Sequence, residues 1–265
     1  MIFKITFKVL DQGASLPLSY QYELSSWIYR LMADVNRPFA AWLHDQGYNL
    51  QGKRFKLFTF SRLNVPKGGY AIQGDRMQIN APSISFRVSF LAEQAAEILL
   101  MGMFQEQTLR LGDKKSQVLL KVEQVELLPV PLFGERAHFR TASPVVITQK
   151  TPDHNKDTYL HPLSPNFTDL FWHNLKSKYM HAVSYNLTEA LDWESDSFVL
   201  KILSNEQQIK SRLITIKAFT PQQTRIRGYL FDFELTAPPL LLRFGTVAGF
   251  GAFCSQGFGC VRVLN

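Results

Sequence analysis

The stretch Gly249-Phe250-Gly251-Ala252-Phe253-Cys254-Ser255-Gln256-Gly257-Phe258-Gly259 contains two Gly-Phe-Gly units separated by five residues. Glycine adopts positive φ angles readily and lacks a Cβ, so backbone N–H groups can come close to a ligand and bind an anion. The pattern predicts a loop whose glycines face outward towards a polyanion while its phenylalanines anchor it in the core. The same composition is also typical of a long glycine-rich turn. The four glycines are Gly249, Gly251, Gly257 and Gly259.

The spacing of these units resembles a signature of the repeat-associated CRISPR RNA-binding superfamily. In that superfamily a glycine–hydrophobic–glycine unit near the carboxyl terminus is repeated after five residues, and the match here is complete. A doubled unit at this spacing is more specific than a single glycine-rich motif. The resemblance implies that the loop supports RNA binding and that its four glycines belong to the RNA-binding residues.

Composition predicts a soluble, folded and basic protein. The chain has 265 residues, of which 46% are hydrophobic and 19% charged, so a packed core is expected. A formal net charge of +7 favours a polyanionic partner. The two cysteines, Cys254 and Cys260, match neither a disulfide framework nor a zinc signature. Because no apolar run reaches about 18 residues and no signal peptide is visible, we expect a cytoplasmic protein that does not contact a membrane.

The first half of the chain alternates between strand and helix patterns. Residues 2–10 alternate apolar and polar side chains, as a half-buried strand does. Residues 24–31 carry apolar side chains at i, i+3, i+4 and i+7, which predicts an amphipathic helix. A second helix is expected between a cap at Asn36 and a stop at Gly47. The remaining segments are strand-like over 54–63, 79–90 and 118–128 and helical over 91–103.

This order of elements, β-α-β-β-α-β, is typical of the ferredoxin-like fold, which RNA-recognition modules also use. The second half repeats it less completely, with a helix after Ser164-Pro165, strands over 198–203 and 214–235, and a short helix from Pro238-Pro239. We therefore predict an α+β protein of two tandem ferredoxin-like domains, the second degraded. Residues 1–128 form the first domain and residues 129–265 the second, which carries the glycine-rich loop.

The residues that could carry chemistry in the first half are a tyrosine, a histidine and a lysine. We expect Tyr29 and His44 to project away from the cores of consecutive helices, and Lys56 to begin the following strand. Such a set can cleave RNA without a metal, because the ribose 2′-OH is a built-in nucleophile. His44 can move the proton, Lys56 can offset phosphoryl charge, and Tyr29 can donate a hydrogen bond. An exposed histidine near a helix end is also often only a solvated or capping residue.

Metal and cofactor chemistry is not expected. None of the six histidines forms a close ligand pair with a second histidine and a carboxylate, and neither cysteine has a C-x-x-C partner. A phosphate-binding P-loop motif is also absent from the sequence. We predict neither a metal site nor a cofactor.

Three further stretches resemble the CRISPR-associated endoribonucleases that process precursor CRISPR RNA. They are Leu16-Pro17-Leu18-Ser19-Tyr20 leading to Ile28-Tyr29, Trp42-Leu43-His44-Asp45, and Lys56-Leu57-Phe58-Thr59-Phe60-Ser61. The resemblance implies an active site at Tyr29, His44 and Lys56, and products with a 2′,3′-cyclic phosphate and a 5′-hydroxyl. Because Lys53 and Arg54 lie close by in the sequence, either of them is an alternative catalytic cation.

Arginines before the glycine-rich loop complete the expected RNA-binding surface. Arg225 and Arg227 share one face of a predicted strand and can contact phosphates, although alternating arginines also keep sheet edges soluble. We expect a metal-independent, sequence-specific endoribonuclease that cuts CRISPR repeat transcripts into guide RNAs. The alternative is a non-catalytic RNA-binding subunit, and contact with other subunits of a CRISPR effector complex stays open for both. A general RNA-recognition module is disfavoured because its aromatic strand motif is absent from the sequence.

Overall fold

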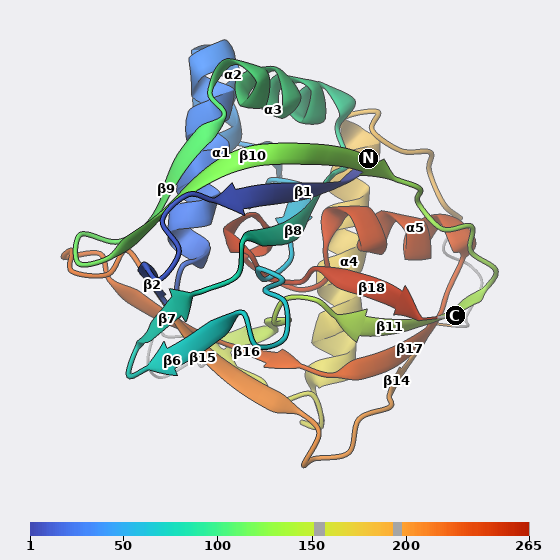
Figure 1. The fold of residues 1–265 in the computed structure, drawn as a ribbon. Helices are drawn as coiled ribbons and strands as arrows, with labels where there is room; N and C mark the ends of the chain where they lie inside the picture. The colour runs from blue at the N-terminus through green and yellow to red at the C-terminus, as the bar shows by residue number, and fades with distance from the viewer. Residues whose placement is uncertain (151–156, 193–197, 265) are drawn as a thin grey trace.

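A computed structural model describes residues 1–150, 157–192 and 198–264 (Figure 1). The helices are α1 (Gln21–Val35), α2 (Arg37–Asp45), α3 (Glu93–Gln105), α4 (Phe167–Ser184) and α5 (Pro239–Ala248). The strands of the first half are β1 (Ile2–Val9), β2 (Ser15–Pro17), β3 (Tyr48–Leu50), β4 (Lys53–Phe55), β5 (Phe58–Phe60), β6 (Tyr70–Gln73), β7 (Arg76–Ile79), β8 (Ser83–Phe90), β9 (Thr108–Gly112) and β10 (Gln117–Leu128). Those of the second half are β11 (Arg136–Thr141), β12 (Thr148–Lys150), β13 (Asp157–Tyr159), β14 (Val199–Ile202), β15 (Lys210–Ile216), β16 (Thr224–Leu230), β17 (Asp232–Thr236) and β18 (Val261–Leu264).

The first half forms an antiparallel sheet with the strand order β5-β8-β1-β10-β9. The alternation of β1 places Phe3, Ile5, Phe7 and Val9 in the core. The ring of Phe7 meets that of Trp27 in α1 at a centroid distance of 5.5 Å, so the predicted amphipathic stripe of α1 packs on this sheet. The helix α3 packs beside α1.

The second half forms its own antiparallel sheet, with the order β14-β17-β11-β18. The expectation that this half is degraded is wrong for the order of its elements. Apart from the inserted pairs β12–β13 and β15–β16, four strands and two helices have the order β11-α4-β14-β17-α5-β18. Sequence patterns concealed this order because β14 and β18 are only four residues long and the hairpin of β15 and β16 is inserted between the strands. In Figure 1 this sheet lies below the first one, with α4 behind it.

The two sheets share one hydrophobic core. A single cluster of buried side chains includes Phe58 and Phe60 from the first half and Phe139, Phe233 and Phe250 from the second. Residues 129–135 connect β10 to β11 between the sheets. Among the helices that the structure describes, none is long and apolar enough to cross a membrane.

Candidate active site

His44 lies at the carboxyl end of α2, exposed to solvent. The Asn36 side chain accepts a hydrogen bond from the Phe39 amide (3.1 Å) and so fixes the start of this helix, as the sequence predicts. The Nδ1 atom of His44 lies 2.7 Å from Oδ1 of Asp45, and this hydrogen bond lowers the pKa of the Asp45 carboxyl. An ionised carboxylate only accepts hydrogen bonds, so Nδ1 carries the proton and Nε2 is left for proton transfer.

Tyr29 does not project into solvent as the sequence analysis expected. It is half-buried on α1, with its ring edge-on to those of His44 (5.0 Å between centroids) and Phe58 (5.7 Å). The apolar pattern of α1 predicted which of its residues face the first sheet. It did not predict the contacts of Tyr29 with α2 and β5. Burial raises the pKa of Tyr29, while a hydrogen bond with the Ser255 side chain opposes the increase. The phenol therefore stays protonated near neutral pH and can act as a hydrogen-bond donor.

Lys56 lies between two strands rather than at the start of one long strand. The segment predicted as a strand over 54–63 is broken because Leu57 adopts a positive φ of 52° between β4 and β5. At this break the Lys56 ammonium donates a hydrogen bond to the main-chain carbonyl of His44 (2.6 Å). A Cβ at Gly47 would lie 2.6 Å from the Phe55 carbonyl oxygen and 2.9 Å from Cδ of Lys56, so glycine is needed there to let the backbone before Lys56 come close. Burial lowers the pKa of Lys56 to about 8.

The two alternative cations are directed elsewhere. Arg54 donates to the carbonyl oxygen of Asp45 (3.1 Å), beyond the end of α2. The ammonium of Lys53 lies 3.0 Å from Nε2 of His173 on α4, and the Lys53 carbonyl accepts a hydrogen bond from His181 on the same helix (3.1 Å). Of the three cations, Lys56 is the one that lines the cavity occupied by Tyr29 and His44.

This cavity has a volume of about 670 Å³ and gathers residues from both halves of the chain. The α1–α2 pair contributes Tyr29 and His44, and Lys56 follows from the break before β5. The second half contributes Ser255 and Gln256 from the glycine-rich loop and Lys217, which follows β15. Arg30 of α1 and Arg37 of α2 add positive charge from the first half. The structure thus brings together the three residues that the sequence analysis selected. Within residues 1–150, 157–192 and 198–264, no group of His, Cys, Asp or Glu side chains could hold a metal ion.

The four glycines of the loop are buried, contrary to the expectation that they face outward. Each has a positive φ and a neighbour that leaves no room for a side chain. A Cβ on Gly259 would lie 2.1 Å from the Phe250 carbonyl oxygen, and one on Gly257 2.6 Å from the ring of Phe60. The amide of Gly259 donates to the carbonyl of Pro144 (2.8 Å), so the chain itself uses this N–H group. Gly249 and Gly257 thus allow close packing against the first half, and Gly251 and Gly259 against the second half's own backbone. Ser255 and Gln256 line the cavity.

Hydrogen bonds from both halves fix the shape of the loop. The buried ammonium of Lys178 on α4 donates to the carbonyls of Gly249 (2.5 Å) and Gly251 (2.9 Å). From the first half, Thr59 donates to the carbonyl of Phe258 and Ser25 to that of Ser255, each at 2.7 Å. The loop is therefore held from three sides before any ligand binds.

Arg225 and Arg227 are exposed on β16, as predicted, but neither lines the cavity. Arg227 donates to the Ser211 hydroxyl on the paired strand β15 (2.9 Å). A second basic group forms around Arg62. Although Arg62 is exposed as a residue, desolvation of its guanidinium lowers its pKa, and the nearby charges of Arg212 and Arg262 lower it further. Sequence patterns did not reveal this group, because its members come from separate elements. They also did not single out Arg30, although it follows Tyr29 directly on α1.

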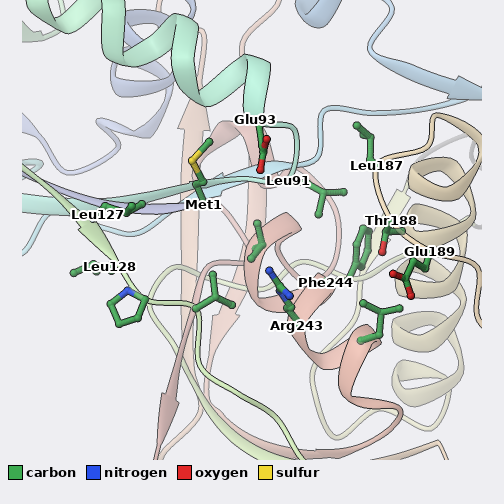
Figure 2. A pocket seen from close by; sticks show the side chains of 14 residues that line it. Met1, Leu91, Glu93, Leu127, Leu128, Leu187, Thr188, Glu189, Arg243 and Phe244 are labelled. Atoms are coloured by element: carbon green, nitrogen blue, oxygen red, sulfur yellow. The ribbon is translucent and has the colours of Figure 1, made fainter.

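A larger cavity, of about 760 Å³, lies on another part of the molecule (Figure 2). Figure 2 shows Arg243 near the middle of the view, with Glu93 above it, Glu189 to its right, and leucine side chains and Met1 around them. None of the side chains lining it is a histidine, tyrosine or lysine. The smaller cavity is the one of the two that holds a histidine, a tyrosine and a lysine together, and it is the candidate active site.

The fold and this cavity define an α+β protein in which a histidine, a tyrosine and a lysine meet beside a glycine-rich loop. Two family models match the chain: that of the N-terminal part of CRISPR-associated protein Cas6 over residues 15–123, and that of its C-terminal part over residues 128–263. The chain belongs to the Cas6 family of CRISPR-associated proteins.

Individual relatives are distant but match over nearly the whole chain. A CRISPR-associated endoribonuclease Cas6 of Methanocaldococcus jannaschii is 28% identical, over 95% of this chain and 88% of its own. The Cas6nc protein of Pyrococcus horikoshii, named as endoribonuclease-like, is 23% identical over the full length of both chains. The solved structure of a Cas6-related protein from Pyrococcus furiosus has the same fold, with a TM-score of 0.82 at 22% identity over 100% of this chain and 98% of its own.

Proposed function

We propose that the protein is a metal-independent, sequence-specific endoribonuclease that cleaves CRISPR repeat transcripts into guide RNAs. The observation that carries this proposal is the meeting of Tyr29, His44 and Lys56 in one cavity beside the glycine-rich loop. Membership of the Cas6 family supports the choice of CRISPR repeat RNA as the substrate.

The proposed reaction is an in-line attack of a ribose 2′-OH on the adjacent phosphate. The 2′ oxygen forms a bond to phosphorus while the bond to the 5′ oxygen breaks, which leaves a 2′,3′-cyclic phosphate and a 5′-hydroxyl. Nε2 of His44 takes the 2′-OH proton or supplies one to the leaving oxygen, because Nδ1 is engaged by Asp45. The Lys56 ammonium stabilises charge on the phosphoryl oxygens, and the Tyr29 hydroxyl donates a hydrogen bond that positions the ribose or phosphate.

Residues of the glycine-rich loop and two sets of arginines would hold the rest of the RNA. Ser255 and Gln256 would contact the RNA inside the cavity, with Gly249, Gly251, Gly257 and Gly259 contributing by keeping the loop in place. Arg225 and Arg227 would bind phosphates along the hairpin of β15 and β16, and Arg62, Arg212 and Arg262 would bind phosphates at a second position. Affinity based on such contacts falls as salt rises.

Two ferredoxin-like domains, with a boundary after residue 128, would account for the architecture. In both sheets the first and third strands of a β-α-β-β-α-β order lie in the middle, as β1 and β8 and as β11 and β17. This repeated order supports the proposal, while the shared core joins the two domains.

A non-catalytic RNA-binding subunit of a CRISPR ribonucleoprotein is the second candidate. It is favoured by the similarity to Cas6nc of Pyrococcus horikoshii, which is named endoribonuclease-like. Such a protein would hold the repeat RNA for other subunits of an effector complex and would not need proton transfer by His44.

The test is incubation of the cognate repeat RNA with the native protein in excess chelator. A matched RNA carries a single 2′-deoxy nucleotide immediately 5′ of the cleaved phosphate. We expect cleavage of the all-ribose RNA, with cyclic-phosphate and 5′-hydroxyl ends, and none of the deoxy RNA. Tight binding of the all-ribose RNA without cleavage would favour the RNA-binding subunit, and cleavage of the deoxy RNA would contradict 2′-OH attack.

The low pKa of Lys56 predicts an alkaline limit to activity. Lys56 is charged below about pH 8 and neutral above it, so the cleavage rate should fall about tenfold per pH unit once the pH exceeds 8. An arginine stays charged across this range, so Lys56→Arg should lose this alkaline decline even if its maximal rate is lower. Single-turnover rates between pH 6 and 10 measure the effect, and Lys53→Arg is the control that should keep the decline. An unchanged alkaline decline in Lys56→Arg would assign it to another group.

A further inference from the structure

The turn between β15 and β16 is held in one shape by its own hydrogen bonds. The amide of Thr220 donates to the carbonyl of Lys217 (3.2 Å), and the amide of Gln223 to that of Thr220 (3.0 Å). The side-chain oxygen Oε1 of Gln223 accepts a hydrogen bond from the amide of Phe219 (3.0 Å). These hydrogen bonds fix the backbone from which the Phe219 side chain extends.

This shape places an aromatic ring in solvent at a conformational cost. Lys217 and Phe219 have φ angles of 50° and 61°, a region that side chains larger than asparagine seldom adopt. Phe219 is 60% exposed, so burial of its ring does not offset that cost. Strained backbone of this kind is typical of sites that bind a ligand.

A second turn, from the first half of the chain, meets this ring. The Lys115 ammonium lies 4.6 Å from the centroid of the Phe219 ring. Lys115 belongs to the turn between β9 and β10, which the Asp113 carboxylate shapes by accepting hydrogen bonds from the amides of Lys115 and Ser116. In Figure 1 the two turns come together at the left edge of the molecule.

The two turns lie next to the candidate active site. Lys217, two residues before Phe219, lines the cavity that contains Tyr29 and His44. Arg225, on the other arm of the hairpin, adds positive charge near the same turn. An RNA strand that leaves the cavity past Lys217 would therefore meet an exposed aromatic ring surrounded by cations.

We propose that Phe219 is a stacking platform for one unpaired base of the bound RNA, close to the cleaved phosphate, and that Lys115 binds the phosphate beside that base. This inference rests on the proposed function, since it assumes that RNA occupies the cavity. The base lies on the part of the ring that Lys115 does not cover. Stacking accepts every base, because each has a π-face, so Phe219 contributes affinity and position rather than sequence preference.

Affinity measurements test the proposal separately from cleavage. Binding of the cognate repeat RNA is measured in chelator, at fixed salt, with RNA that carries a 2′-deoxy nucleotide before the cleavage site. We expect Phe219→Ala to weaken binding roughly tenfold, the effect of one stacked base. Phe219→Trp should bind like the native protein, and Phe219→Leu, which is apolar but cannot stack, should bind like Phe219→Ala. The control is Phe104→Ala, which removes a 79% exposed phenylalanine from α3.

Abasic nucleotides locate the stacked base. One abasic position near the cleavage site should weaken binding to the native protein and have no added effect in Phe219→Ala, because both changes remove the same contact. The stacking proposal is overturned if Phe219→Ala or Phe219→Leu binds the RNA as tightly as the native protein does. It is also overturned if no abasic position has this effect. Cleavage of all-ribose RNA by these variants would still support the proposed function. If the native protein binds the RNA tightly but does not cleave it, the proposed endoribonuclease activity is wrong. The affinity measurements would still test stacking on Phe219.

Discussion

Replacing His44 with alanine should lower the single-turnover cleavage rate roughly 100- to 10,000-fold, the usual contribution of a general acid or base. The histidine side chain is 66% exposed, so its removal should leave the free energy of unfolding within about 0.5 kcal/mol of the native value. RNA affinity should change little, because the imidazole contributes to the transition state and not to the phosphate contacts. Rates in excess protein, affinities with 2′-deoxy RNA and urea denaturation give these three quantities.

A matched control for His44→Ala is available in the second sheet. His138 on β11 is also a partly exposed histidine paired with a carboxylate, that of Glu234, and its side chain is 47% exposed. We expect His138→Ala to cleave at the native rate. Equal rates for native protein and His44→Ala would show that another group transfers the proton, and equal losses in both variants would point to a general effect of removing histidine.

The second large effect is expected on stability, from Gly259→Ala. The added Cβ would lie 2.1 Å from the carbonyl oxygen of Phe250, whose amide is itself bound to the Gly259 carbonyl (2.9 Å). Because the obstructing atom belongs to the backbone of a buried segment, neither arm of the loop can move away without breaking these hydrogen bonds. We expect a loss of at least about 3 kcal/mol in the free energy of unfolding, measured by urea denaturation.

Gly68→Ala is the control for this experiment, because it measures the cost of a positive φ without a steric clash. Gly68 has a similar φ of 80°, but no atom lies within 4 Å of the position that an added Cβ would take, so its substitution should cost only about 1 kcal/mol. If Gly259→Ala were as stable as Gly68→Ala and yet bound RNA weakly, the glycine would contact RNA directly. That result would support the outward-facing loop that the sequence pattern predicts.

The sequence predicted local features better than features that depend on contacts between distant segments. The cap at Asn36, the first strand and the stripe of α1 follow from neighbouring residues, and the structure confirms them. The trio of Tyr29, His44 and Lys56 was found through resemblance and helix geometry, and the structure places it in one cavity. The burial of Tyr29 and of the loop glycines could not be predicted, because it depends on β5 and on segments about 200 residues apart.

The completeness of the second sheet was also hidden from the sequence. Its strand β18 has four residues and pairs with β11, more than 100 positions earlier in the sequence. No local sequence pattern predicts a pairing between such distant strands. The structure also buries Lys178 against the loop carbonyls, although lysine side chains on helices usually face solvent. A lone lysine carries no sequence signal that distinguishes these two environments.

The hydrogen bond from Thr59 to the carbonyl of Phe258 spans 199 positions of the chain. During synthesis Thr59 and Phe60 leave the ribosome long before the loop that packs against them. Part of the apolar surface of the first half therefore stays uncovered until the glycine-rich loop has been translated. Contacts of such long range also slow folding, because closing so long a loop costs chain entropy before the contact stabilises the fold. The polypeptide thus acquires its cavity only after Ser255 and Gln256 of the loop have been synthesised.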